Sequence, residues 1–400
     1  MILRNRTVAS LLAAEVVSTT CSQMAAVALP WFVLVTTRSA ARLSWVVAAE
    51  IAGMGVFGVL GGNIAGRAGA RTTLLVCDAA RVPLTAAIPL LHSLGALPFA
   101  LLVALSFGLG AFSAPAFGAR VALVPDVVGE EERAIGKAQT LFQASNRLTI
   151  LAGPVLGGLL IGVTGATNVL WIDAASYLVA IALVAAFVPR AAPHDCAPAR
   201  SDVLAGARFV WRDPLLRAWM LAGTLLEVCW QSLFVAIAYL AYRDFHHDAH
   251  LVGYAYGAFG GGALLGSALA FRLLDRVEPV LMASAGMAVQ IAPLTLLPFD
   301  TPAWVVVAAL AGLGFFNPFV NSAASGVSGA RVPARLRQQA ATFSLSLNGV
   351  FAPVGVLAAG PALAAFGARP VLAALVGVEA VGITWYASQG FRAWAAPAAA

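Results

Sequence analysis

Twelve apolar stretches follow one another along this 400-residue chain, each of about 18 or more residues, the length that a helix needs to cross a bilayer. Only short polar segments separate them. The expected spans are 7–35, 44–65, 73–92, 96–119, 138–163, 168–188, 216–242, 250–272, 278–298, 302–325, 338–366 and 370–388. The sequence therefore predicts an all-α membrane protein with twelve transmembrane helices.

Charged residues are scarce, since only 10% of the chain is Asp, Glu, Lys or Arg while 60% is apolar. An ordinary soluble domain carries about 25% charged residues to cover its surface. No long segment lacks an apolar neighbour, so no extramembrane domain is expected. The basic residues are scattered among short loops, which excludes nucleic acid as a partner and leaves the lipid bilayer.

The two halves of the chain resemble each other. Gly165–Leu170, after the fifth span, recurs as Gly367–Leu372 after the eleventh, and Ala114–Phe117 in the fourth span corresponds to Asn317–Phe319 in the tenth. Paired six-span repeats are typical of transporters that move one bundle against the other around a central site. We expect a bundle at 1–188, a cytoplasmic linker at 189–215 and a second bundle at 216–400.

The linker 189–215 contains a short amphipathic pattern. Its apolar side chains fall on one helical face: Val203, Leu204, Ala207, Val210 and Trp211. This pattern is compatible with an interfacial helix. A plain linker is the preferred interpretation.

Basic residues in short loops stay on the cytoplasmic side of a membrane. With the amino terminus inside, eighteen basic residues fall in cytoplasmic segments, Arg120 among them, and four in outer loops. Arg81 and Arg147 lie within spans. We therefore expect a multi-pass protein of the bacterial plasma membrane with both termini in the cytoplasm.

Several motifs together resemble the major facilitator superfamily, and within it the bacterial exporters that include enterobactin (siderophore) exporters and macrolide-efflux pumps. The matching segments are Ala28–Leu34, Thr37–Ala40, Asp78–Arg81, Ala119–Arg120, Val124–Asp126, Gly153–Gly158 and Ile172–Tyr177. The resemblance covers almost the whole chain. It implies two pseudo-symmetric six-helix bundles and a cavity lined by the first, fourth, seventh and tenth spans.

The resemblance also implies a gating motif between the second and third spans. The residues that match it are Gly62, Arg67, Gly69 and Arg71. Gly66 stands where the superfamily has an acid, which weakens a latch in this loop. Asp275 and Arg276, after the eighth span, resemble the second copy of the motif and keep the acid.

A small-residue segment in the fifth span resembles the core of a signature found in exporters that exchange solute for protons. Its residues are Gly153, Pro154, Gly157 and Gly158. Small residues permit close helix approach and proline permits a bend, so the segment suits a hinge. Simple tight packing is the alternative.

An ionised side chain near the bilayer centre costs about 2.5–3.5 kcal/mol, so an acid retained there is a functional candidate. Glu15 lies in the first span with Ser18, Thr19 and Ser22 at helical spacing, and Gln23 follows. Desolvation favours the neutral carboxyl group, so such an acid can take up and release a proton. A structural hydrogen bond is the alternative role.

Glu227 holds the comparable place in the seventh span, with Trp230, Gln231 and Phe234 on its face. Aromatic rings beside a carboxylate suit an amphipathic or cationic ligand. Glu227 is thus a second candidate for solute binding or proton coupling, with the same structural alternative as Glu15.

Arg147, deep in the fifth span, needs a carboxylate partner or a path to the interface. Glu15 is the partner that we expect. Asp78 and Arg81, one turn apart, are expected to form a structural pair near the cytoplasmic edge. Three further acids are placed near the outer edge or the periphery and are weaker candidates: Glu50, Asp173 and Glu379.

Asn317 and Asn321, four residues apart in the tenth span, can offer hydrogen bonds to a solute from the cavity wall. No phosphate-binding loop or catalytic motif is present in the sequence, and no cofactor or metal site is expected.

These features favour a proton-coupled exporter of small amphipathic organic molecules, such as a drug, a siderophore or another secreted metabolite. We expect it to act as a monomer. The alternative is an importer of a small nutrient in the same fold, which would need a denser polar site.

Overall fold

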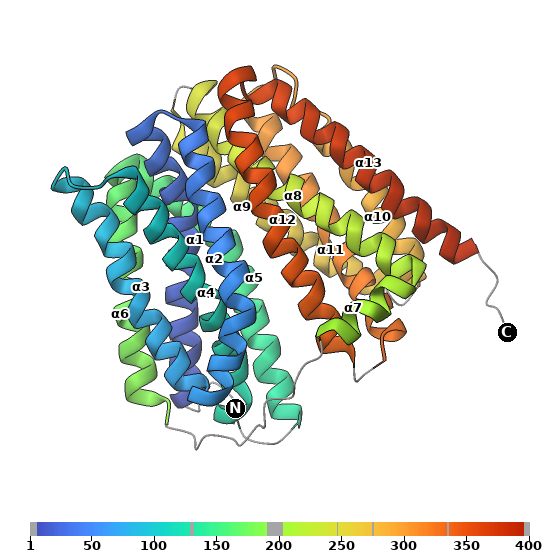
Figure 1. Ribbon diagram of the computed structural model, residues 1–400, viewed down its shortest axis with the longest axis horizontal. Helices are drawn as coiled ribbons and strands as arrows, with labels where there is room; N and C mark the ends of the chain where they lie inside the picture. The colour runs from blue at the N-terminus through green and yellow to red at the C-terminus, as the bar shows by residue number, and fades with distance from the viewer. Residues whose placement is uncertain are drawn as a thin grey trace. The chain divides into compact units, whose positions relative to one another are not determined.

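The computed structural model describes residues 6–128, 132–189, 203–245, 247–273, 276–333 and 336–395 (Figure 1). Within them the chain forms thirteen helices. In the amino-terminal half these are α1 (Arg6–Thr37), α2 (Ala40–Ala68), α3 (Ala70–Ser93), α4 (Phe99–Val128), α5 (Glu132–Thr164) and α6 (Ala166–Phe187). They are followed by α7 (Val203–Arg212), α8 (Pro214–Arg243), α9 (Ala249–Leu273), α10 (Pro279–Leu294), α11 (Ala303–Arg331), α12 (Arg337–Phe366) and α13 (Ala368–Ala395).

Each predicted span falls on one of these helices. Nine helical segments among the described residues are long and apolar enough by themselves to cross a membrane. The apolar parts of α5 and α10 are shorter, at Leu148–Thr164 and Pro279–Leu294. The chain is thus an all-helical membrane protein, as predicted.

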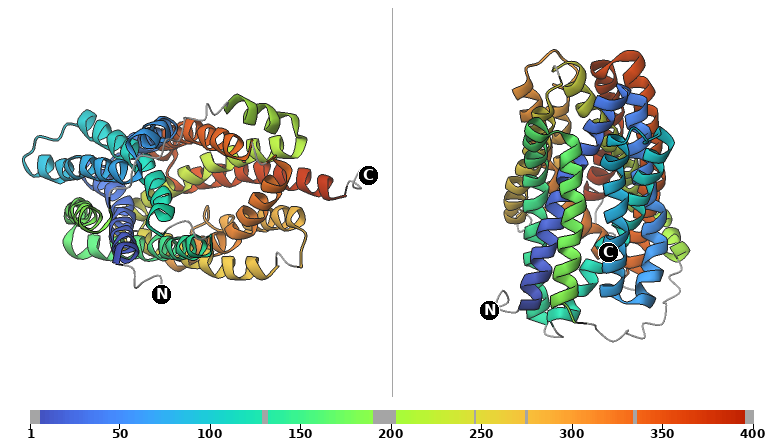
Figure 2. Two further views of the ribbon diagram at one scale, coloured as in Figure 1. Left: turned by 90° about the horizontal axis from the view of Figure 1, so that it is seen from below. Right: turned by 90° about the vertical axis from the view of Figure 1, so that its left-hand side faces the viewer.

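The chain divides into two compact units, Met1–Ala199 and Arg200–Ala400, called here the first unit and the second unit. The first unit contains α1 to α6 and the second contains α7 to α13. Within the first unit, α1 packs along α6 and α5, and α2 packs along α4 (Figures 1 and 2). Within the second unit, α11 packs along α9 and α10, and α8 packs along α13 and α12.

Two of the sharpest turns fall at equivalent glycines. Gly165 (φ 85°) joins α5 to α6, and Gly367 (φ 83°) joins α12 to α13. Only glycine adopts such backbone angles without a steric penalty, so each residue reverses the chain in a single step. The repeated sequence therefore encodes a repeated turn.

Glycines also let helices approach closely at corresponding places in the two units. A Cβ atom on Gly53 of α2 would collide with the carbonyl oxygen of Phe107 on α4, and one on Gly262 of α9 would collide with that of Ala311 on α11. Small residues at such crossings permit backbone-to-backbone packing in an apolar solvent.

The predicted linker contains a helix, α7. Its Val210 is buried in a cluster with Leu216 and Met220 of α8 and Ala340 of α12, while Trp211 is half-exposed. The preference for a plain linker was therefore wrong for Val203–Arg212, because an amphipathic segment of ten residues finds a tertiary partner for its apolar face.

Candidate functional site

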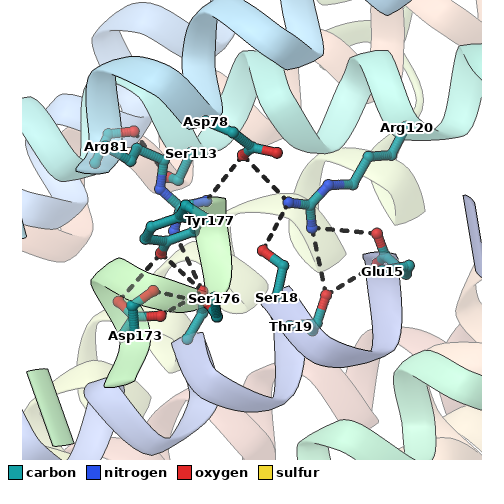
Figure 3. A network of polar contacts seen from close by, with 12 residues as sticks. Glu15, Ser18, Thr19, Asp78, Arg81, Ser113, Arg120, Asp173, Ser176 and Tyr177 are labelled. Atoms are coloured by element: carbon teal, nitrogen blue, oxygen red, sulfur yellow. Dashed lines mark hydrogen bonds and ion pairs between the residues drawn. The ribbon is translucent and has the colours of Figure 1, made fainter. Parts of the chain in front are cut away.

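A buried ionic network joins four helices of the first unit, with Arg120 of α4 at one end (Figure 3). The Nη1 atom of Arg120 lies 3.1 Å from Oε2 of Glu15, and Nη2 lies 3.4 Å from Oδ1 of Asp78. The same guanidinium donates to Oγ1 of Thr19 at 3.3 Å and to Oγ of Ser18 at 3.1 Å. Arg120 thus bridges the polar stripe of α1 to the acid of α3.

Arg81 of α3 continues the network toward α6. Its Nη1 atom lies 3.9 Å from Oδ1 of Asp78, and its Nη2 donates to Oγ of Ser22 at 3.4 Å. The guanidinium stacks over the ring of Tyr177, 4.2 Å from its centroid. Tyr177 donates from its hydroxyl to Asp173 at 3.2 Å, and Ser22 donates to the same carboxylate at 3.3 Å.

The network is withdrawn from solvent and its charges are unequal. The carboxylates belong to Glu15, Asp78 and Asp173, which are 7%, 2% and 4% exposed, and the guanidiniums to Arg81 and Arg120. Three acids face two bases, so the contacting groups carry one surplus negative charge when all are ionised. In a low-dielectric interior this surplus favours uptake of one proton or cation.

The structure gives Glu15 a partner that sequence reasoning had placed elsewhere. Arg120 had been assigned to a cytoplasmic segment because the apolar run of the fourth span ends before it, yet α4 continues to Val128. The side chain of Arg147, the expected partner, lies outside the described residues, so that pairing stays a prediction. The apolar run was ended before the charged Arg120, whereas its guanidinium finds ion pairs inside the unit.

The expected pair of Asp78 and Arg81 is present, but it is part of the larger network. Asp173, predicted to lie near the outer edge with a weaker role, is buried in that network. Glu50 of α2 is partly buried and lies within electrostatic range of Arg81. The segment Ile172–Tyr177, which carried part of the family resemblance, was the available signal for Asp173 and Tyr177.

The small residues of α5 meet α1. A Cβ atom on Gly153 would collide with the side chain of Gln23, and one on Gly157 would lie 2.9 Å from the Cα atom of Met24. Pro154 and Gly158 are buried beside them. The segment is tightly packed in this conformation, and its role as a hinge stays a prediction.

The gating motif is described only in part. Gly69 begins α3 with φ 80°, and Arg71 donates to the carbonyl oxygens of Val188 at 2.7 Å and Ala185 at 3.0 Å. Arg71 thereby ties the start of α3 to the end of α6. Arg276 is exposed. Gly62 and Arg67 belong to the part of α2 of which only the backbone is described, and Asp275 lies outside the described residues.

The second unit contains a cavity of about 780 Å³. Glu227, Trp230, Asn317 and Asn321 line it, four of the residues predicted for a solute cavity. Gln231 donates from Nε2 to Oε1 of Glu227 at 2.9 Å. Asn321 donates from Nδ2 to Oδ1 of Asn317 at 2.8 Å.

Aromatic rings form one wall of the cavity. The ring of Trp230 lies 4.8 Å from that of Phe259 and 4.8 Å from that of Phe234, measured between centroids. Phe234 in turn packs edge-on against Tyr256 at 4.5 Å. The rings hold one another in place, so Trp230 and Phe259 present a fixed apolar surface to the cavity.

Glu379 of α13 also lines this cavity, although sequence reasoning treated it as peripheral. It is only 5% exposed, and the described residues offer it no hydrogen bond or ion pair. Gln290 of α10 lines the same cavity, and its buried Oε1 has no hydrogen-bond partner among the described residues. An apolar helix pattern does not say which face meets a cavity, so sequence alone gave no signal for these two side chains.

Comparison with known proteins identifies the family. Residues 11–240 match the Major Facilitator Superfamily. The chain belongs to this superfamily. The predicted resemblance is therefore confirmed, and the protein is a multi-pass membrane transporter of small molecules rather than an enzyme.

Relatives of this superfamily member include an efflux protein. The chain is 27% identical over 363 residues to the multidrug efflux pump Tap of Mycolicibacterium fortuitum, with 87% of each protein covered. This similarity fits the predicted efflux branch.

Solved structures share the fold. The nucleoside transporter NupG aligns with a TM-score of 0.77 at 13% identity, over 96% of this chain and 99% of that one. A bacterial homologue of the human lysosomal transporter Spinster aligns with a TM-score of 0.71 at 16% identity, over 96% of both chains.

Proposed function

We propose that this superfamily member is a proton-coupled exporter of small amphipathic organic molecules. The observation that carries the proposal is the ionic network of the first unit, in which three buried carboxylates face two guanidiniums. A group of this composition reaches neutrality by binding one proton, which is what a proton-coupled transporter requires of a buried site.

Glu15 is the acid best placed to carry that proton. Its carboxylate meets Arg120 through Oε2 and accepts a hydrogen bond from Thr19 at 3.0 Å through Oε1. Protonation of Glu15 removes its charge and leaves Arg120 paired with Asp78. The tie between α1 and α4 then weakens, and a local charge change biases the packing of two helices.

The cavity of the second unit suits the solute. Aromatic rings, paired asparagines and two carboxylates combine apolar contact with a few polar anchors, as small-molecule sites do. A relative described as a multidrug efflux pump supports export of such molecules.

The proposal includes the arrangement in the membrane. Twelve helices, all except α7, cross the bilayer as two six-helix bundles at 1–188 and 216–400, joined by a cytoplasmic segment at 189–215. Both termini lie in the cytoplasm, and a monomer alternates between states open to either side. The excess of basic residues in the assigned cytoplasmic segments supports this orientation.

Accumulation of lipophilic drug probes in energised inside-out vesicles tests the proposal. The expected result is uptake that a protonophore abolishes and that Glu15→Gln also abolishes. Glu278→Gln is the matched control, because Glu278 is an exposed acid at the start of α10. Uptake only in right-side-out vesicles would replace export with import.

A further inference from the structure

Close glycine contacts at equivalent helix crossings show which residue of the first unit corresponds to which residue of the second. On α4, Gly110 meets the carbonyl oxygen of Glu50, and on α11, Gly314 meets that of Phe259. Each contact joins the same pair of helices within its unit, so Glu50 and Phe259 hold equivalent positions. The charged Glu50 of the first unit thus corresponds to Phe259, an aromatic residue that lines the cavity of the second.

A second pair of contacts aligns α3 with α10. A Cβ atom on Gly108 would lie 3.1 Å from Cδ1 of Leu84, and one on Gly312 would lie 2.9 Å from Cγ of Pro293. Three residues before Leu84 stands Arg81, and three before Pro293 stands Gln290. By the same count Asp78 corresponds to Met287.

The turns at Gly165 and Gly367 align α6 with α13. The alignment of Gly110 with Gly314 can be continued along α4 and α11 to Arg120. Tyr177 lies twelve residues after Gly165, and Glu379 lies twelve residues after Gly367. Arg120 lies ten residues after Gly110, and its equivalent, ten residues after Gly314, is Ala324. Both arginines of the ionic network, Arg81 and Arg120, therefore correspond to uncharged residues in the second unit.

These equivalences explain why the second unit has a cavity. Five of its lining residues stand where the first unit has its ionic network or a neighbour of it: Phe259, Met287, Gln290, Ala324 and Glu379. The cavity has a buried acid, Glu379, at the position of Tyr177, and has no arginine at the positions of Arg81 and Arg120. A buried carboxylate without a counter-charge is unfavourable, so the site gains by admitting a cation.

We infer that the cavity of the second unit binds the cationic group of an amphipathic solute, with Glu379 as the counter-charge. Trp230 and Phe259 receive its apolar portion, and their ring faces also attract a cation. Gln290 offers the buried Oε1 atom as an acceptor to an ammonium or guanidinium donor. The inference rests on the proposed transport function and names its substrate class.

Equilibrium binding of tetraphenylphosphonium to the purified full-length protein in nanodiscs tests the inference. Glu379→Gln keeps the shape of the side chain and removes its charge, and is expected to weaken binding roughly tenfold or more. Binding of triphenylphosphine oxide, a neutral analogue, is expected to change little. Glu278→Gln serves as the control for removal of an exposed acid.

A second variant reaches the same acid from the neighbouring helix α10. Gln290→Arg recreates the arginine that Arg81 supplies in the first unit, so it is expected to neutralise Glu379 and abolish tetraphenylphosphonium binding. This variant keeps the inference testable if Glu379→Gln does not fold. Unchanged affinity in a folded variant of either kind, or no binding by the wild-type protein, would overturn it.

Binding requires no proton gradient, which separates the inference from the proposed function. Glu15→Gln is expected to abolish energised transport and to leave tetraphenylphosphonium affinity intact. If Glu15→Gln transports normally while Glu379→Gln loses cation binding, the proton-coupling proposal fails and the cation site stands. The reverse result rejects the cation site alone.

Discussion

The two units share the same glycine-mediated helix crossings but differ in the polar residues buried between their helices. In the first, Arg81 and Arg120 share a buried network with three carboxylates across four helices, which leaves one carboxylate in excess. In the second, the equivalent positions are Gln290 and Ala324, which line a cavity together with Glu379. Among the described residues, Glu379 has no ion-pair partner.

The difference teaches that glycine contacts preserve the helix crossings while the buried charges can diverge. Backbone-to-backbone contacts depend on the absence of a side chain, so they tolerate replacement of neighbouring residues. The buried ion pairs of the first unit can respond to a change of charge. The cavity of the second unit, with its buried acid, can accommodate a ligand.

The largest effect is expected from Arg120→Gln, which removes the guanidinium that joins α1, α3 and α4. Removing one partner of a buried ion pair costs about 3–5 kcal/mol, because the remaining carboxylates stay buried. Thermal unfolding in detergent should show the loss, and vesicle uptake should fall to background. A stable, fully active variant would remove the first unit's network from the mechanism.

A smaller and symmetrical effect is expected from Gly110→Ala and Gly314→Ala. Each added methyl group would strike a carbonyl oxygen of the facing helix, and such overpacking costs about 1–3 kcal/mol. Both variants should unfold at lower temperature by similar amounts.

The matched controls for these glycines are Gly118→Ala and Gly377→Ala, where an added Cβ would meet nothing within 4 Å. Alanine favours a helix over glycine by about 0.8–1.0 kcal/mol, so the controls should be neutral or slightly stabilised. Destabilisation of only one of Gly110→Ala and Gly314→Ala would break the equivalence of the two units.

Trp230→Ala should affect the second unit alone. Loss of a ring beside a bound cation costs roughly 0.5–2 kcal/mol of binding free energy, measured with tetraphenylphosphonium. Trp304→Ala is the control, because Trp304 is 70% exposed on α11 and lies outside the cavity lining. Equal losses in both variants would point to a nonspecific effect of tryptophan removal.

The smallest effect is expected from Arg331→Gln. Its partner is Asp213, at 3.3 Å, and the arginine side chain is 40% exposed. Solvent-exposed pairs contribute about 0–1 kcal/mol, so the unfolding temperature should change little. A loss as large as that of Arg120→Gln would show that burial does not distinguish the two arginines.

Much of the fold follows from the sequence. The predicted span 216–242 corresponds to Pro214–Arg243, and 338–366 corresponds to Arg337–Phe366. The prediction was poorest where helices continue past their apolar runs, as α4 does to Val128 and α11 to Arg331. Hydropathy reports where a chain prefers lipid, so a charged residue such as Arg120 or Arg331 that forms an ion pair within the protein is mistaken for the end of a span.

The candidate site was predicted unevenly. Glu15 and Glu227 stand out because an acid inside an apolar run is costly wherever the run packs. The internal repeat was visible, but the glycine contacts align Ser113 with Asn317, one residue away from the match of Pro115 with Pro318 suggested by the sequence. A one-residue error of this kind would conceal the equivalence of Arg120 with Ala324.

The sequence by itself determined that the solvent is lipid, where the helices lie, and which acids are out of place, because each depends on the character of a local stretch of residues. Only the tertiary structure decided that Glu15 meets Arg120 and that Glu379 lines a cavity with no arginine partner among the described residues. Those outcomes depend on which faces of distant helices pack together. Glycine contacts between backbones set those faces, and no local pattern of hydropathy contains them.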